Sequence, residues 1–205
     1  MASFAVWSIA FVLWLVLLVF FWHYRIWLMF YVTASVGLAL LIAFAGTRLV
    51  PLERWLEMAT AYTAHAISQA IGIPTRVFEA APGNILVWVI VQEPGWTIVR
   101  VDLECSGLLE MAVLAGLLLF YPAWSVWRRV ELLVWGLAAT YVSNVIRILS
   151  IIAILHGEGK RSIFVAHTIV GRLIFFALAA LLYWIIFTRL TLRTLRAREQ
   201  ESMRA

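Results

Sequence analysis

Three side chains suited to acyl-transfer chemistry lie far apart in an otherwise apolar chain: Cys105, Arg147 and His167. Cys105 follows a strand-like stretch and opens a predicted helix, where free backbone amides and the helix dipole stabilise a thiolate. His167 has the titration range of the general base and acid that a cysteine nucleophile requires. Arg147 offers fixed donors to an oxyanion or to the thiolate. Together these residue types indicate a nucleophilic cysteine site.

Each of the three also has a structural interpretation. A lone cysteine is often a small buried hydrophobe. Arg147 can pair with Glu110 and hold helices together, and the residue types alone do not separate this pairing from catalysis. Arg172 is a second cation able to offset acidic residues near the thiol, and His167 can be a packed histidine near the membrane interface.

Several other chemistries are excluded by the sequence. A single cysteine rules out an internal disulfide and a cysteine-based zinc cage, and the four histidines show no HExxH spacing. There is no GxSxG elbow and no glycine-rich phosphate loop. We therefore expect neither a metal nor a cofactor. The net charge of +5 is concentrated in the C-terminal tail, which indicates membrane topology rather than nucleic-acid binding.

The composition predicts how these residues are positioned. Hydrophobic residues make up 64% of the chain and charged residues 13%, which excludes an ordinary cytosolic domain and a disordered chain. Uncharged stretches reach the about 20 residues that a membrane span needs. They predict an all-α polytopic membrane bundle, a single integral membrane domain over 1–205. Its five spans are expected at about 5–22, 26–45, 108–127, 132–155 and 165–190.

The stretch of about 47–104 between the second and third spans is predicted to lie outside the membrane core. Its first part has apolar residues at helical spacing, such as Leu52, Trp55 and Ile67, with Glu57 and Ser68 on the other side. This pattern predicts an extracytoplasmic amphipathic helix on the membrane surface or against the bundle. Its second part predicts a β-hairpin, with strands over 84–92 and 96–103 around Pro94-Gly95, just before the cysteine.

The alternation of spans brings the polar residues to one side of the membrane. The start of the third span, the end of the fourth and the start of the fifth must share a face. These segments carry Cys105 and Glu110, Asn144 and Arg147, and His167 and Arg172. The Arg128-Arg129 turn and the arginine-rich tail outnumber Lys160 and Arg161, so the positive-inside rule predicts a cytoplasmic C-terminus, an outside N-terminus and an extracytoplasmic site.

Three short motifs, in this order, resemble the exosortase/archaeosortase family. They are Cys105-Ser106-Gly107 after the hairpin, Asn144-Val-Ile-Arg147 late in the next span, and His167-Thr-Ile-Val-Gly171 at the start of another. The resemblance covers about 96–187. It implies that Cys105 is the nucleophile, Arg147 the stabilising arginine and His167 the acid/base. It also implies supporting roles for five further residues: Asn144, Ser106, Gly107, Glu110 and Arg172.

The resemblance also implies a substrate and a location. The enzyme would be a cysteine protease or transpeptidase of the cell membrane, acting at the extracytoplasmic face. Its partners would be exported proteins whose C-terminus carries a short motif, a hydrophobic span and a basic cluster, with release by water or by an acceptor. Two other interpretations remain open: a non-catalytic envelope scaffold, and a membrane acyl- or glycosyltransferase.

Overall fold

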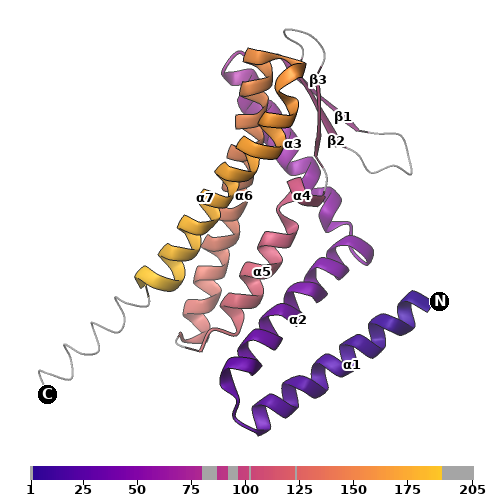
Figure 1. Cartoon of the computed structure of the whole chain (residues 1–205), viewed down its shortest axis with the longest axis vertical. Coiled ribbons are helices and arrows are strands. Elements are labelled where there is room, and N and C mark those ends of the chain that lie inside the picture. Colours follow the sequence, from indigo (N-terminus) through magenta and orange to yellow (C-terminus); the bar gives the residue numbers. More distant parts are fainter. Residues whose placement is uncertain (1, 80–86, 92–96, 102, 123, 191–205) are drawn as a thin grey trace, which may run out of the picture.

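The structure is a computed structural model that describes residues 2–79, 87–91, 97–101, 103–122 and 124–190. It is a mostly helical bundle with a small antiparallel sheet at one end, here called the sheet end (Figure 1). The helices before and beside the sheet are α1 (Ala2–His23), α2 (Trp27–Arg48) and α3 (Leu52–Ala70). The strands are β1 (Thr75–Glu79), β2 (Val87–Val91) and β3 (Thr97–Val101). The remaining elements are α4 (Leu103–Ser106), α5 (Leu108–Leu119), α6 (Val126–Glu158), η1 (Lys160–Ser162), η2 (Val165–Val170), α7 (Gly171–Tyr183) and η3 (Trp184–Leu190).

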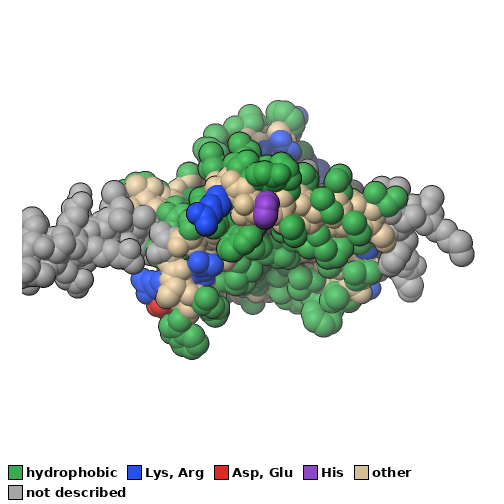
Figure 2. Space-filling view, turned by 90° about the horizontal axis from the view of Figure 1, so that it is seen from below, with side chains coloured by type: hydrophobic (Ala, Val, Ile, Leu, Met, Phe, Trp, Pro, Cys, Tyr) green, Lys and Arg blue, Asp and Glu red, His purple; other side chains and the backbone are tan. Residues whose placement is uncertain are grey.

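The described helices include three that are long and apolar enough to cross a membrane: Trp27–Arg48, Val126–Glu158 and Val165–Arg189. Two shorter apolar helices, Trp7–His23 and Leu108–Leu119, fall where the sequence predicted the first and third spans. Seen from the end opposite the sheet, the surface is dominated by hydrophobic side chains with a few Lys and Arg (Figure 2). The chain is therefore a membrane protein, and its count of five spans stays a prediction.

The helices differ in their bounds from the third and fourth predicted spans. A helix over 108–127 was expected, but α5 ends at Leu119 and α6 already begins at Val126. Pro122 lacks a backbone donor and favours a break there. The Arg129 guanidinium donates to the carbonyl of Leu119 at 2.8 Å, which satisfies a terminal carbonyl of α5. Ser125 then caps α6 by accepting from the Arg128 amide at 3.5 Å.

The bundle is layered along α5 and α6. α2 packs along α5, α5 and α7 both pack on α6, and α1 lies against α2 (Figure 1). α2 and α5 approach each other closely at Gly116, where a Cβ would collide with the Ser35 carbonyl oxygen. Small residues at such contacts let helix backbones approach closely in a membrane.

α3 packs against the bundle with the polar side of its amphipathic pattern, not with its apolar side. Glu57 is 1% exposed and Ser68 is fully buried, whereas Trp55 is 63% exposed. The inward face is a stripe of small and polar residues: Glu57, Thr60, Ala61, Ala64 and Ser68. This face packs against α4 and α6. Because lipid is as apolar as a protein core, an apolar helix face has no need to turn inward.

The β-region is a three-stranded sheet rather than a hairpin alone. Its order is β1-β2-β3, and both pairings are antiparallel. The strand β1 was not predicted from the sequence. It is fastened to α3, since His65 Nδ1 is hydrogen-bonded to Thr75 Oγ1 at 2.8 Å and Gln69 donates to the Thr75 carbonyl at 2.9 Å. The predicted turn at Pro94-Gly95 lies outside the described residues.

Candidate active site

Cys105 lies where the sheet passes into the membrane bundle. It is fully buried in α4, one short turn after β3. The sequence predicted that Cys105 opens a long helix, but Gly107 separates it from α5. Gly107 has a φ of +77°, a left-handed conformation that favours glycine. Ser106 Oγ accepts from the Leu108 amide at 3.1 Å and so helps to start α5.

Asn144 fixes the backbone of the cysteine to α6. Its side-chain amide donates to the carbonyl oxygen of Cys105, and Asn144 itself is fully buried. The two residues are 39 positions apart in sequence, so this hydrogen bond joins separate elements. It holds the chain that carries the thiol against the helix that also carries Arg147.

His167 contacts the thiol directly. Cys105 Sγ and His167 Nε2 are 3.7 Å apart. His167 lies in η2, a π-helical segment, and such segments are frequent at functional sites. A Cβ at Gly171 would lie 2.9 Å from Ile151 Cδ1, so the glycine allows this helix to approach α6 closely. The separation matches a cysteine–histidine pair, whose hydrogen bond is often long before substrate binds.

Arg147 is buried in α6, one turn after Asn144, and is only 4% exposed. Its guanidinium carbon lies 5.6 Å from the centroid of the Phe175 ring in α7, a cation–π contact that restrains the side chain. Arg172, the other candidate cation, is on the exposed side of α7. Of the two arginines, Arg147 is the one held inside the bundle.

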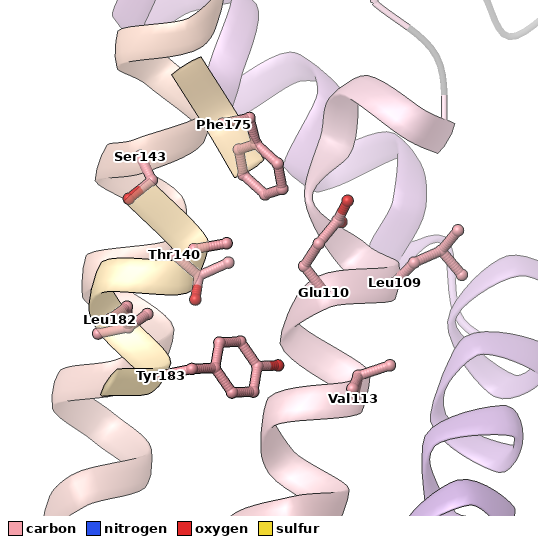
Figure 3. A pocket seen from close by; sticks show the side chains of 9 residues that line it. Leu109, Glu110, Val113, Thr140, Ser143, Phe175, Leu182 and Tyr183 are labelled. Atoms are coloured by element: carbon pink, nitrogen blue, oxygen red, sulfur yellow. The ribbon is translucent and has the colours of Figure 1, made fainter. Parts of the chain in front are cut away.

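Glu110 is half-buried in the first turn of α5 and lines a groove between α5 and α7 of about 200 Å³. Figure 3 shows Glu110 on the α5 side and Phe175 and Tyr183 on the α7 side. Phe175 thus contacts Arg147 and borders the space that Glu110 lines. The groove borders the candidate site through Glu110 and through Phe175, which contacts Arg147.

A second cavity borders His167. It has a volume of about 320 Å³ and separates β3 from η2. Its lining residues are Ile98, Val99, Ile151, Ile163, Phe164, His167 and Thr168. Val99 and Ile151, which line this cavity, belong to the same buried cluster as Cys105.

The burial of one acidic residue, Glu57, was not predicted from the sequence. Among the described residues, the charged side chains that are buried are Glu57 and Arg147. Glu57 begins the inward stripe of α3, whose Ala61 and Ala64 belong to the same cluster as Cys105. Small residues at helical spacing after Glu57 were the available signal, because they favour close helix packing.

A second histidine lies near the sheet end. His156 is half-buried in the last turn of α6, which continues to Glu158. Within the described ranges, no group of three or more His, Cys, Asp or Glu side chains is placed to hold a metal ion.

The comparisons with known proteins give one match. The sequence model described as transmembrane exosortase matches residues 1–184, a range that includes every candidate site residue. No curated protein and no solved structure matches the chain. The match confirms the family resemblance carried by the three motifs.

Proposed function

Since the chain belongs to the transmembrane exosortase family, we propose that it is a membrane-embedded cysteine protease or transpeptidase that cleaves the C-terminal sorting signals of exported proteins. The observation that carries the proposal is the 3.7 Å separation of Cys105 Sγ and His167 Nε2. These residues are 62 positions apart and lie on different elements. A buried thiol beside an imidazole is the arrangement that activates a cysteine nucleophile.

The reaction follows from this pair. His167 takes the proton of the Cys105 thiol, and the thiolate attacks the carbonyl carbon of the scissile peptide bond. The carbon–nitrogen bond breaks as His167 returns the proton to the leaving amine, which leaves a thioester on Cys105. Water or an acceptor amine then attacks the thioester and releases the thiol.

Arg147 has the role of stabilising the oxyanion that forms during attack. A guanidinium presents fixed donors, and a partly dehydrated site strengthens their interaction with a developing charge. The contact with Phe175 restrains the position of the guanidinium. Asn144 holds Cys105 in a fixed position relative to Arg147, because its side-chain amide donates a hydrogen bond to the Cys105 carbonyl.

The cavity between β3 and η2 is the proposed place for the recognition motif of the substrate. It borders His167, and two of its lining residues, Val99 and Ile151, pack in the same buried cluster as Cys105. The proposed topology is a single integral membrane domain over 1–205 with five spans, its sheet end outside the cell membrane and its C-terminus inside. The tail that favours this orientation, 191–205, lies outside the described residues.

The orientation is tested with an impermeant thiol reagent on intact cells, in a Cys105→Ala background. Lys160→Cys is exposed at the sheet end and is expected to react from outside. Trp127→Cys, at a position that is 82% exposed near the other end, should react only after the membrane is opened. The reverse labelling pattern would place the sheet end in the cytoplasm.

The nucleophile is tested by Cys105→Ala with a co-expressed exported protein that carries a tripartite C-terminal tail. We expect processing to be abolished while the amount of inserted enzyme stays near normal, because the cysteine is buried among apolar residues that tolerate alanine. Gel mobility of the substrate and immunoblotting of the membrane fraction measure the two effects. Processing at the wild-type rate would instead favour a scaffold.

A further inference from the structure

β3 is an edge strand of the sheet, and its free side faces η2. The strand order β1-β2-β3 gives β3 one partner among the described strands, which is β2. The described lining of the cavity of about 320 Å³ includes residues of β3 and η2 but none of β2, so this cavity lies on the far side of β3 from β2 (Figure 1). An edge strand carries backbone N–H and C=O groups that can pair with another extended chain.

The cavity reaches the edge of β3 itself. Side chains alternate along this strand: Thr97, Val99 and Val101 are at most 4% exposed, whereas Ile98 is 44% exposed. Successive residues of a strand face opposite sides of its sheet. Ile98 and Val99 both line the cavity, so the cavity passes around the strand edge between the two faces. The backbone at this edge therefore borders open space.

The opposite edge of the sheet has a different environment, because α3 is bonded to it. Gln69 donates to the carbonyl of Thr75 in β1 at 2.9 Å. Phe78, also in β1, is 61% exposed and lies on the same face of the sheet as Ile98 by the register of the strands. β1 is thus a control edge for any binding to β3.

The other wall of the cavity belongs to the candidate site. His167 lines the cavity, and its Nε2 atom lies 3.7 Å from Cys105 Sγ. β3 ends at Val101, four residues before Cys105. A chain that runs along the free edge of β3 therefore passes the imidazole and follows the strand towards the segment that carries the thiol.

The scissile segment of a substrate must be extended when it is cleaved. In a helix each carbonyl is bonded within the helix and covered by the neighbouring turns, so a thiolate does not reach the carbonyl carbon. Unwinding frees the backbone polar groups, and such groups destabilise a buried complex unless they find new partners. The edge of β3 offers these partners beside the proposed base.

We propose that the substrate segment next to the scissile bond binds as an added strand on the free edge of β3, between this strand and η2. Main-chain hydrogen bonds to β3 hold the segment, and its side chains alternate between the two faces of the sheet. This inference rests on the proposed function, because it takes the ligand to be the part of an exported protein that precedes its hydrophobic span.

The cavity also determines which side chains the added strand presents. Val99 and Ile151 on its inner side are 3% and 0% exposed, and Ile163 and Phe164 add further apolar surface. Burial of an apolar side chain against them is favourable, whereas a charged one would lose its hydration. The substrate class is therefore an extended segment with an apolar residue at the position that enters the cavity.

The test is disulfide cross-linking in isolated membranes, with Cys105→Ala enzyme so that the reporter is not cleaved. The reporter is an exported protein whose tripartite tail the wild-type enzyme processes. Its single cysteine is moved one residue at a time through the segment before the hydrophobic span. Ile98→Cys gives the enzyme its only thiol on β3, and Phe78→Cys is the matched control on β1. Copper phenanthroline serves as the oxidant.

We expect Ile98→Cys to cross-link every second position of the reporter, with yields about three- to tenfold above those of the positions between. Residues opposite each other on paired strands have Cβ atoms about 5 Å apart, close to the distance that a disulfide bridges. Their neighbours in sequence point to the other face of the sheet. Phe78→Cys should give background yields at all positions.

A second measurement tests the cavity in enzyme that keeps Cys105. Ile163→Trp, at a lining position that is 41% exposed, should fill the cavity and lower processing of the reporter about tenfold. Ile169→Trp is the control, because Ile169 is 44% exposed in η2 and is not among the described lining residues.

Three results would overturn the inference: cross-links from Ile98→Cys without a two-residue period, equal yields from Phe78→Cys, or unchanged processing by Ile163→Trp. A disulfide-linked enzyme dimer from Ile98→Cys that the reporter does not suppress would instead make a second copy of the chain the occupant of this edge. Failure of the proposed function is a separate result. Processing of the reporter by Cys105→Ala would show that the cysteine is not the nucleophile, whereas the cross-linking pattern still reports strand pairing.

Discussion

The two ends of the bundle are filled with different kinds of side chain. Near the sheet, the buried cluster combines Cys105 and small residues such as Ala61 with isoleucines of α6. At the opposite end, the buried cluster combines Trp124 with leucines and Ile186. Partly buried rings pack against it, with Trp124 at 4.4 Å from Tyr121 and at 5.9 Å from Phe187 between ring centroids. The sheet end therefore holds the buried polar groups that could act in catalysis. The opposite end is held together by the packing of aromatic rings.

This difference reflects what stabilises a helix bundle in lipid. Burial of apolar surface contributes little there, so dispersion contacts and hydrogen bonds between helices hold the bundle together. The aromatic end relies on dispersion contacts between rings. The sheet end relies on hydrogen bonds between helices, such as the one from the Asn144 side chain to the Cys105 carbonyl. We therefore expect substitutions at the sheet end to affect catalysis and those at the other end to affect folding.

The largest effect is expected from His167→Ala. Removing the base that lies 3.7 Å from the thiol should lower the processing rate about 10²- to 10⁴-fold, without loss of inserted protein. His156→Ala is the matched control, because His156 is also half-buried near the sheet end. The rates are measured with a co-expressed substrate. Loss of processing in His156→Ala alone would exchange the roles of the two histidines.

A smaller loss is expected from Arg147→Lys. Lysine keeps the charge but not the planar set of donors, so an oxyanion site should lose about 10²- to 10³-fold in kcat. A purely structural cation should tolerate the change better. Acyl-enzyme formation on Cys105, followed by mass spectrometry, separates these cases. Near-normal thioester formation in the lysine variant would assign Arg147 to packing.

The smallest effect on catalysis, and a clear effect on stability, is expected from Trp124→Ala at the aromatic end. Trp124 is 6% exposed, so its loss should lower the free energy of unfolding by roughly 3 kcal/mol. Trp127→Ala, at an 82% exposed position, should change it little. Thermal unfolding in detergent measures stability, and activity is normalised to folded enzyme. A lower kcat in folded Trp124→Ala would mean that the two ends are coupled.

The candidate site illustrates how much could be predicted from the sequence. Span alternation alone placed Cys105, Arg147 and His167 at one end of the bundle, because each crossing reverses the direction of the chain. It could not separate Arg147 from Arg172, since which side of a helix is buried depends on its neighbours. The structure buries the first and exposes the second.

The fold, too, was determined in part by the sequence and in part only by the tertiary structure. Composition and uncharged stretches determined a helical membrane protein, because crossing a hydrocarbon layer requires long apolar segments whatever they pack against. They could not determine the inward face of α3, where Glu57 is buried and Trp55 is exposed. In water, an apolar face would mark the core, but in a membrane lipid covers that face equally well. Only the tertiary structure decided which polar groups meet, and hence that the thiol of Cys105 lies beside the imidazole of His167.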